Sequence, residues 1–138
     1  EIMYNKKVME IFQNPQNVGE IKGASGIGTS VDEQCGDIIK LYLQINKNIV
    51  TDAKFKAFGC AGTIACGSVI TELVLNKTVE EISKITSDEI LKAVGGLPEQ
   101  KVFSSIVAKV AIDKAILDYN KKQLKLLKSK NKKNTKKN

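Results

Sequence analysis

Two segments of alternating polarity, joined by a tight turn, constrain the fold of this chain more than any other feature. Every second residue of 38–45 is apolar, as expected for a β-strand with one buried face. Asn46-Lys47-Asn48 is a turn sequence, and residues 49–58 alternate again. We therefore expect an antiparallel hairpin whose apolar face is covered by other elements.

Helical patterns before and after the hairpin provide that cover. Residues 4–12 predict a short helix that ends at Asn14-Pro15. After the hairpin, apolar residues recur at helical spacing, and capping-box sequences begin at Thr78 and Thr86. The predicted helices begin at about residues 4, 63, 78, 86 and 101.

The separation of strands from helices along the sequence predicts an α+β fold, with helices packed on one face of a small sheet. The stretch from Gly23 to Gly28 lies before the hairpin, and we interpret it as extended and flexible. It lacks the strand–glycine–helix context and the lysine of a phosphate-binding loop.

The formal net charge of +7 resides at the end of the chain. Residues 121–138 contain nine lysines and no acidic residue, and the remainder is close to neutral. We therefore expect a folded domain, residues 1–120, and a Lys/Asn-rich tail, residues 121–138, in which the last helix frays into disorder. The tail has no aromatic side chain to stack on a base, so a nucleic-acid partner is not expected.

The sequence predicts no contact with a membrane. No apolar run is long enough to span a bilayer, and the first residues lack the regions of a signal peptide. We expect a cytoplasmic protein. In that compartment three cysteines, an odd number, favour thiolate chemistry or burial over a disulfide framework.

Two cysteines lie where the strands of the hairpin begin and end. Cys35-Gly36-Asp37 precedes the first strand, and Gly59-Cys60 follows the second. These points meet at one end of an antiparallel hairpin, so Cys35, Asp37 and Cys60 are expected to share a rim. Cys60 would also open a helix, where backbone N–H groups favour a thiolate. Two thiolates and a carboxylate suit iron, an iron–sulfur cluster or zinc.

The alternative from the residues alone is that these cysteines are buried and inert, as many free cysteines are. Their spacing is not that of a CxxC pair, so burial and a metal site stay open about evenly. The chain contains no histidine, which excludes Ser-His-Asp and Cys-His catalytic sets.

Several segments, in their order and spacing, resemble the NifU/IscU family of iron–sulfur cluster assembly scaffolds. The resemblance extends over roughly residues 3–119 and is carried by several motifs together. The segments are Tyr4-Asn5-Lys6-Lys7-Val8-Met9, Asn14-Pro15-Gln16-Asn17-Val18-Gly19, Cys35-Gly36-Asp37, residues 53–60, Thr71-Glu72-Leu73 and Gly95-Gly96-Leu97-Pro98.

This resemblance implies a three-stranded antiparallel sheet with about five helices on one face. It also implies a scaffold rather than an enzyme, which receives sulfur from a cysteine desulfurase and iron from a donor. The scaffold would hold a transient [2Fe-2S] cluster and pass it to acceptor apo-proteins. Cys35, Asp37 and Cys60 would be the ligands, with Asp37 keeping the cluster exchangeable. The run from Leu97 to Lys101 resembles the family's recognition segment for an Hsp70-type chaperone pair.

The chain departs from the family pattern at Phe103-Ser104, where the family usually has His-Cys. One explanation is that Ser104 is an engineered replacement, although the missing histidine argues against this as a complete account. A second is that Cys66 is the third thiolate. It would lie about 9 Å from Cys60 along a helix axis and roughly 120° around it, which is poor geometry for one cluster.

A third explanation is a natural, divergent scaffold. It would hold its cluster weakly through two thiolates, Asp37 and the Ser104 oxygen, or two chains would share one cluster through Cys35 and Cys60 of each. A monomer or a weak homodimer is therefore expected.

Other functions also stay open at this point. A degenerate or zinc-binding family member would act as a desulfurase-binding or regulatory module without assembling clusters. A redox-active thiol protein would use Cys60, with Cys35 as the resolving thiol. A nucleic-acid binder would depend on the basic tail and be sensitive to salt.

Overall fold

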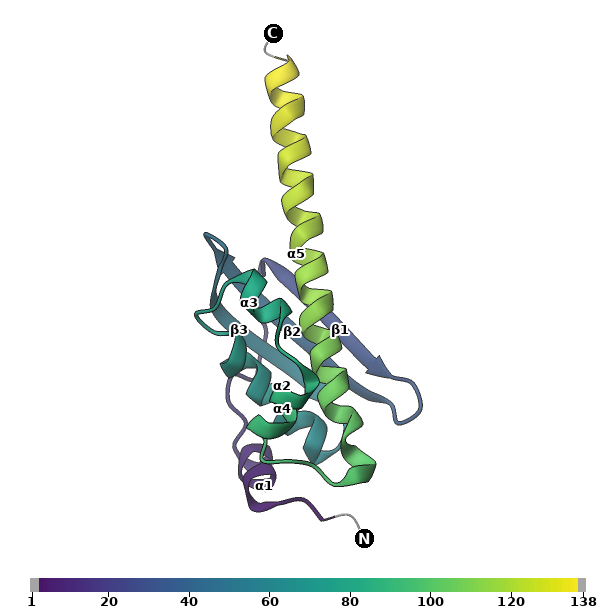
Figure 1. Cartoon of the computed structure of the whole chain (residues 1–138). Coiled ribbons are helices and arrows are strands. Elements are labelled where there is room, and N and C mark those ends of the chain that lie inside the picture. Colours follow the sequence, from purple (N-terminus) through teal and green to yellow (C-terminus); the bar gives the residue numbers. More distant parts are fainter. Residues whose placement is uncertain (1–2, 137–138) are drawn as a thin grey trace.

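The computed structural model describes residues 3–136 of the chain. Its sheet has three antiparallel strands in the order β1-β2-β3. Helix α2 packs mainly over β3, and helix α5 packs over β1 and β2 (Figure 1). The strands are β1 (Gly26–Asp32), β2 (Asp37–Asn46) and β3 (Ile49–Phe58), and the two helices are α2 (Ala61–Val74) and α5 (Phe103–Lys136). The expected α+β architecture, with helices on one face of a three-stranded sheet, is confirmed.

Shorter helices complete the layer over the sheet. Thr78 and Glu81 form the predicted capping box, and the Thr86 side chain caps the next helix by accepting the Glu89 N–H. The short elements are α1 (Lys6–Gln13), α3 (Val79–Ser83), α4 (Ser87–Ala93) and the 3₁₀-helix η1 (Glu99–Lys101).

The predicted hairpin of β2 and β3 is confirmed, with one irregularity in its pairing between Gln44 and Ile45. Ile39 pairs with Ala57, and Leu41 pairs with Phe55. The side chains of Ile39, Leu41 and Phe55 are buried from solvent. The turn places Lys47 at φ 50° and Asn48 at φ 69°; asparagine tolerates this left-handed region better than most residues. The alternation therefore places one apolar face of the hairpin against the helices.

The glycines near the start of β1 allow a close approach of a helix. A methyl group at Gly28 would overlap the backbone of Ala111 and Ala115 in α5, and one at Gly26 would overlap the Ala115 carbonyl oxygen. The expectation of a flexible stretch is therefore wrong for residues 26–28. They belong to a strand, and glycine is needed there because α5 lies directly on it.

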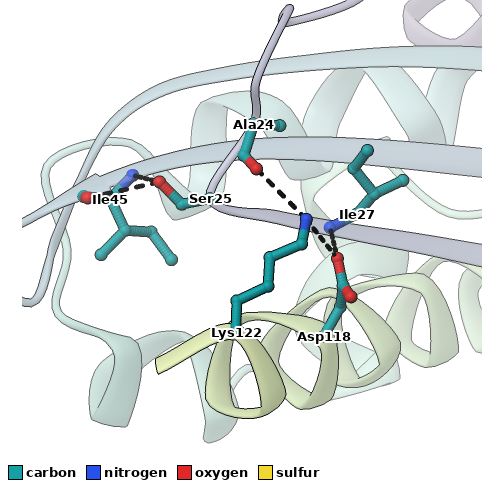
Figure 2. Close-up of polar contacts among 6 residues, drawn as sticks. All are labelled: Ala24, Ser25, Ile27, Ile45, Asp118 and Lys122. Carbon is teal, nitrogen blue, oxygen red and sulfur yellow. Dashed lines mark hydrogen bonds and ion pairs between the residues drawn. The ribbon is translucent and has the colours of Figure 1, made fainter. Parts of the chain in front are cut away.

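Two side chains of α5 fix that helix against β1. Asp118 accepts the Ile27 N–H at 2.8 Å, and Lys122 Nζ lies 2.9 Å from Asp118 Oδ2 (Figure 2). Lys122 also donates to the Ala24 carbonyl oxygen at 3.2 Å. These bonds satisfy backbone groups of a strand at the edge of the sheet, where open backbone groups would otherwise invite pairing with another chain.

Helix α5 continues through the segment for which we expected a fraying tail. It runs to Lys136 and projects beyond the sheet (Figure 1). Residues 121–131 are exposed along their whole length. Lysine, leucine and glutamine have high helix propensity, so the helix continues past its last contact with the sheet. The predicted boundary between domain and tail at residue 120 thus lies within a helix. That residues 121–138 form a tail separate from the folded domain stays a prediction.

Within the described part of the chain, no helix has both the length and the hydropathy needed to cross a membrane.

Candidate functional site

The start of β2 and the end of β3 meet at one end of the sheet. Ile38 pairs with Phe58, and this register brings Asp37 beside the Gly59-Cys60 segment. At Gly59, where φ is 153°, a Cβ atom would lie 2.6 Å from Asp37 Oδ1. Glycine at this position therefore makes room for the buried carboxylate.

Four side chains at this end of the sheet, those of Asp37, Cys60, Thr63 and Ser104, form what we call the rim cluster. The Thr63 hydroxyl is central, because it donates to Asp37 Oδ2 at 2.8 Å and lies 3.1 Å from Ser104 Oγ. Cys60 Sγ lies 3.3 Å from Thr63 Oγ1, and 3.8 Å from both Asp37 Oδ2 and Ser104 Oγ. The structure thus brings together three of the residues that the sequence singled out, and adds Thr63.

Cys60 is the most exposed residue of the rim cluster. Thr63 and Ser104 are fully buried, and Asp37 is only 4% exposed. Cys60 is half-buried and is the N-cap residue of α2. The Asp37 carboxylate is therefore less accessible from outside than Cys60 is.

The surroundings of Cys60 favour its thiolate. Burial alone would raise the pKa of the Cys60 thiol, but hydrogen bonds from its neighbours, among them the Tyr4 phenol and the Thr63 backbone N–H, outweigh it, so the pKa is lowered. Burial and the bond to Cys60 raise the pKa of Tyr4, which therefore stays protonated and able to donate. The site thus holds a thiol that ionises more readily than an ordinary one.

Cys35 lies in the exposed turn between β1 and β2, at the same end of the sheet. The Asp32 side chain shapes this turn by accepting the N–H groups of Gln34 at 3.0 Å and Cys35 at 3.5 Å. Among the described residues, no three Cys, Asp or Glu side chains are arranged to hold a metal ion together. A role for Cys35 as a ligand would therefore require this turn to bring its sulfur towards Cys60.

Cys66 lies away from the rim, in the hydrophobic core. It is fully buried, and burial raises the pKa of its thiol to about 12. The structure therefore separates Cys66 from the candidate ligands, and a third thiolate at this position would need a different conformation of α2.

The sequence analysis did not indicate two residues that contribute to the site, Thr63 and Tyr4. Thr63 is three positions after the helix-opening Cys60, and first-turn residues at that spacing lie on one side of a helix. Tyr4 reaches the site from the segment before α1, and its ring would contact a methyl group placed on Gly62 at 3.4 Å. Spacing along the helix could have indicated Thr63, whereas Tyr4 is brought in by tertiary packing alone.

Comparison with known proteins decides the family. The family model described as the NifU-like N-terminal domain matches residues 3–126. The chain belongs to this family. It is 46% identical over 124 residues to the iron-sulfur cluster assembly scaffold protein IscU 1 of Archaeoglobus fulgidus, covering 90% of this chain and 81% of that protein.

Other members of the NifU-like family agree. The IscU scaffold protein of Rickettsia prowazekii is 41% identical over 124 residues, which cover 87% of this chain and 94% of that protein. The crystal structure of a nitrogen-fixing NifU-like protein (N-terminal) from Brucella abortus superposes with a TM-score of 0.68. It is 23% identical, and 86% of this chain and 95% of that one are covered. At this identity, the structural likeness shows the fold alone.

Ser104 marks the departure of this chain from the NifU-like pattern. Its hydroxyl lies inside the rim cluster, at the position for which the family resemblance implies a cysteine. The cluster therefore presents one thiol, one carboxylate and two hydroxyls, whereas a cysteine at position 104 would give it a second thiol. A mixed sulfur and oxygen set of this kind fits iron, but holds it less firmly than a set of thiolates.

Proposed function

We propose that this chain is a scaffold on which an iron–sulfur cluster is assembled and from which the cluster is passed on. The observation that carries the proposal is the rim cluster, in which Cys60 Sγ and Asp37 Oδ2 lie 3.8 Å apart at an accessible end of the sheet. The close similarity to proteins named as scaffolds supports the same function.

The ligands of the cargo are Cys60 and Asp37 from the rim cluster and Cys35 from the neighbouring turn, with Ser104 as a further oxygen. A thiolate binds iron firmly, whereas a carboxylate oxygen exchanges more readily. Asp37 therefore makes the cluster easy to release, which suits a carrier. The cluster is of the [2Fe-2S] type, as the family resemblance implies.

The partners follow from this role. A cysteine desulfurase gives sulfur to the exposed Cys35 or to Cys60, an iron donor gives iron, and acceptor apo-proteins take the finished cluster. A chaperone pair of the Hsp70 type binds the connector from Leu97 to Lys101, in which Glu99 and Gln100 are exposed. The protein works in the cytoplasm as a monomer or a weak homodimer and turns over no substrate itself.

Anaerobic reconstitution with ferrous iron and sulfide tests the function. The wild-type protein is expected to develop visible absorption from sulfide-to-iron charge transfer, whereas Cys60→Ser should lose most of it and Cys35→Ser a large part. Cys66→Ser is the matched control, since Cys66 is buried in the core and should leave the spectrum unchanged. A wild-type protein that stays colourless would rule the function out.

A second candidate follows from the single thiol of the rim cluster, since among the described residues no three Cys, Asp or Glu side chains are arranged to hold a metal ion. A family member that cannot hold an iron–sulfur cluster would serve as a desulfurase-binding or regulatory module and carry zinc. It predicts zinc, and no inorganic sulfide, in protein purified without air.

A further inference from the structure

The Asp37 carboxylate is buried, although the Cys60 sulfur beside it belongs to a half-buried residue. Asp37 is 4% exposed, and its Oδ1 lies against Gly59. The other oxygen, Oδ2, accepts the Thr63 hydroxyl at 2.8 Å and is the oxygen 3.8 Å from the Cys60 sulfur. Thr63 therefore holds the very oxygen that a metal bound at Cys60 would need.

The Thr63 hydroxyl has one proton, and it uses this proton in the hydrogen bond that it donates to Asp37. The Thr63 oxygen can then only accept, and its other neighbours are the Ser104 hydroxyl at 3.1 Å and the Cys60 sulfur at 3.3 Å. The bonds run in one direction, from Ser104 through Thr63 to Asp37. Because Thr63 and Ser104 are fully buried, water cannot replace either of them without a change in packing.

We propose that Thr63 is a positioning residue that holds the Asp37 carboxylate in its buried orientation, so that turning this carboxylate outward to a metal at Cys60 breaks the bond between Thr63 and Asp37. This inference rests on the proposed function and assigns a role to a residue that is not itself a ligand. Cargo binding to Asp37 is weakened by the cost of that bond, which favours release. A hydrogen bond that instead supported the ligand would strengthen binding, so the two roles differ in sign.

Removal of the hydroxyl provides the test. In Thr63→Val the shape is kept but the donor is lost, and ferrous iron, titrated anaerobically into the full chain, should bind about tenfold more tightly. Thr63→Ser keeps a hydroxyl and should restore the wild-type affinity. Thr71→Val is the matched control, because Thr71 is equally buried on α2 but bonds to the Ser68 carbonyl oxygen.

A double-mutant cycle with Asp37→Asn separates this role from general packing. If Thr63 acts through Asp37, the gain in iron affinity from Thr63→Val should disappear in the Asp37→Asn background. A second measurement uses the same four proteins without iron. The change in the free energy of unfolding for the double variant should differ from the sum of the two single changes. Thr63→Ala removes the same hydroxyl from a smaller side chain and replaces Thr63→Val if that variant fails to fold.

The outcomes distinguish this inference from the proposed function. Wild-type protein that binds no ferrous iron overturns the proposed function, and the role of Thr63 in binding falls with it. If wild-type protein binds iron but Thr63→Val binds it equally or more weakly, the proposed function stands and the role of Thr63 is overturned. Additive effects of the two substitutions, in iron binding or in unfolding, overturn it as well.

Discussion

At the scale of single residues, hydrogen bonds determine how the side chains of the rim cluster behave. The closeness of Asp37 and Cys60 could be predicted from the sequence. The alternating polarity and the turn sequence indicate that the start of one strand lies beside the end of the other. The position of Tyr4 could not, since it depends on how the chain before α1 packs on α2. Asn5 anchors that segment by donating to the carbonyl oxygens of Gly95 and Gly96, each at 2.8 Å.

Replacing Tyr4 with phenylalanine should make Cys60 less acidic. The Tyr4 phenol contributes to lowering the pKa of the Cys60 thiol, so its loss moves the pKa upward and reduces the thiolate fraction at any pH below it. Site-resolved alkylation of the metal-free protein across pH should show the Cys60 profile displaced to higher pH, with slower reaction at pH 7. Tyr119→Phe, on α5, is the control; equal profiles for Tyr4→Phe and wild type would contradict the prediction.

At the scale of elements, local sequence patterns do not reveal features that depend on contacts between elements distant in the sequence. The hairpin and the capped helices are local features, and the sequence predicted them. The demand for glycine in β1 arises from the backbone of α5, which comes much later in the chain, so no local pattern reveals it. The fraying of the chain after residue 120 stays a prediction, because composition alone does not distinguish a lysine-rich exposed helix from a disordered tail.

Adding one methyl group to β1 should therefore weaken the packing of α5. In Gly28→Ala the new Cβ overlaps α5 backbone that cannot move aside, and we expect a loss of about 3 kcal/mol in the free energy of unfolding. Urea denaturation would measure it. Thr29→Ala, at the adjacent exposed position of the same strand, should cost about 0.5 kcal/mol or less. Similar losses for both variants would show that α5 does not press on β1 as described.

The molecule as a whole combines a nearly neutral body with a basic, projecting helix. Lys122 of α5 bonds to the Ala24 carbonyl oxygen just before β1, and residues 123–131 are exposed. The body therefore carries the core and the rim cluster, while residues 123–131 of α5 contribute charge at an exposed surface. The family match ends at residue 126, close to this point.

Truncation after residue 126 should leave the body intact. Because the removed part of α5 described by the structure buries no side chain, the free energy of unfolding should change by less than about 0.5 kcal/mol. The loss of visible absorption in Cys60→Ser should be the same in the short and the full chain. A large drop in stability on truncation would show that the end of α5 packs against something in solution.

Iron and acid-labile sulfide in protein purified without air test the central claim most directly. A scaffold that holds a cluster through the rim should contain iron and sulfide in equal amounts, and Cys60→Ser should contain neither, while Cys66→Ser matches the wild type. Zinc without sulfide, or iron and sulfide that persist in Cys60→Ser, would contradict the claim that the rim cluster carries an iron–sulfur cargo.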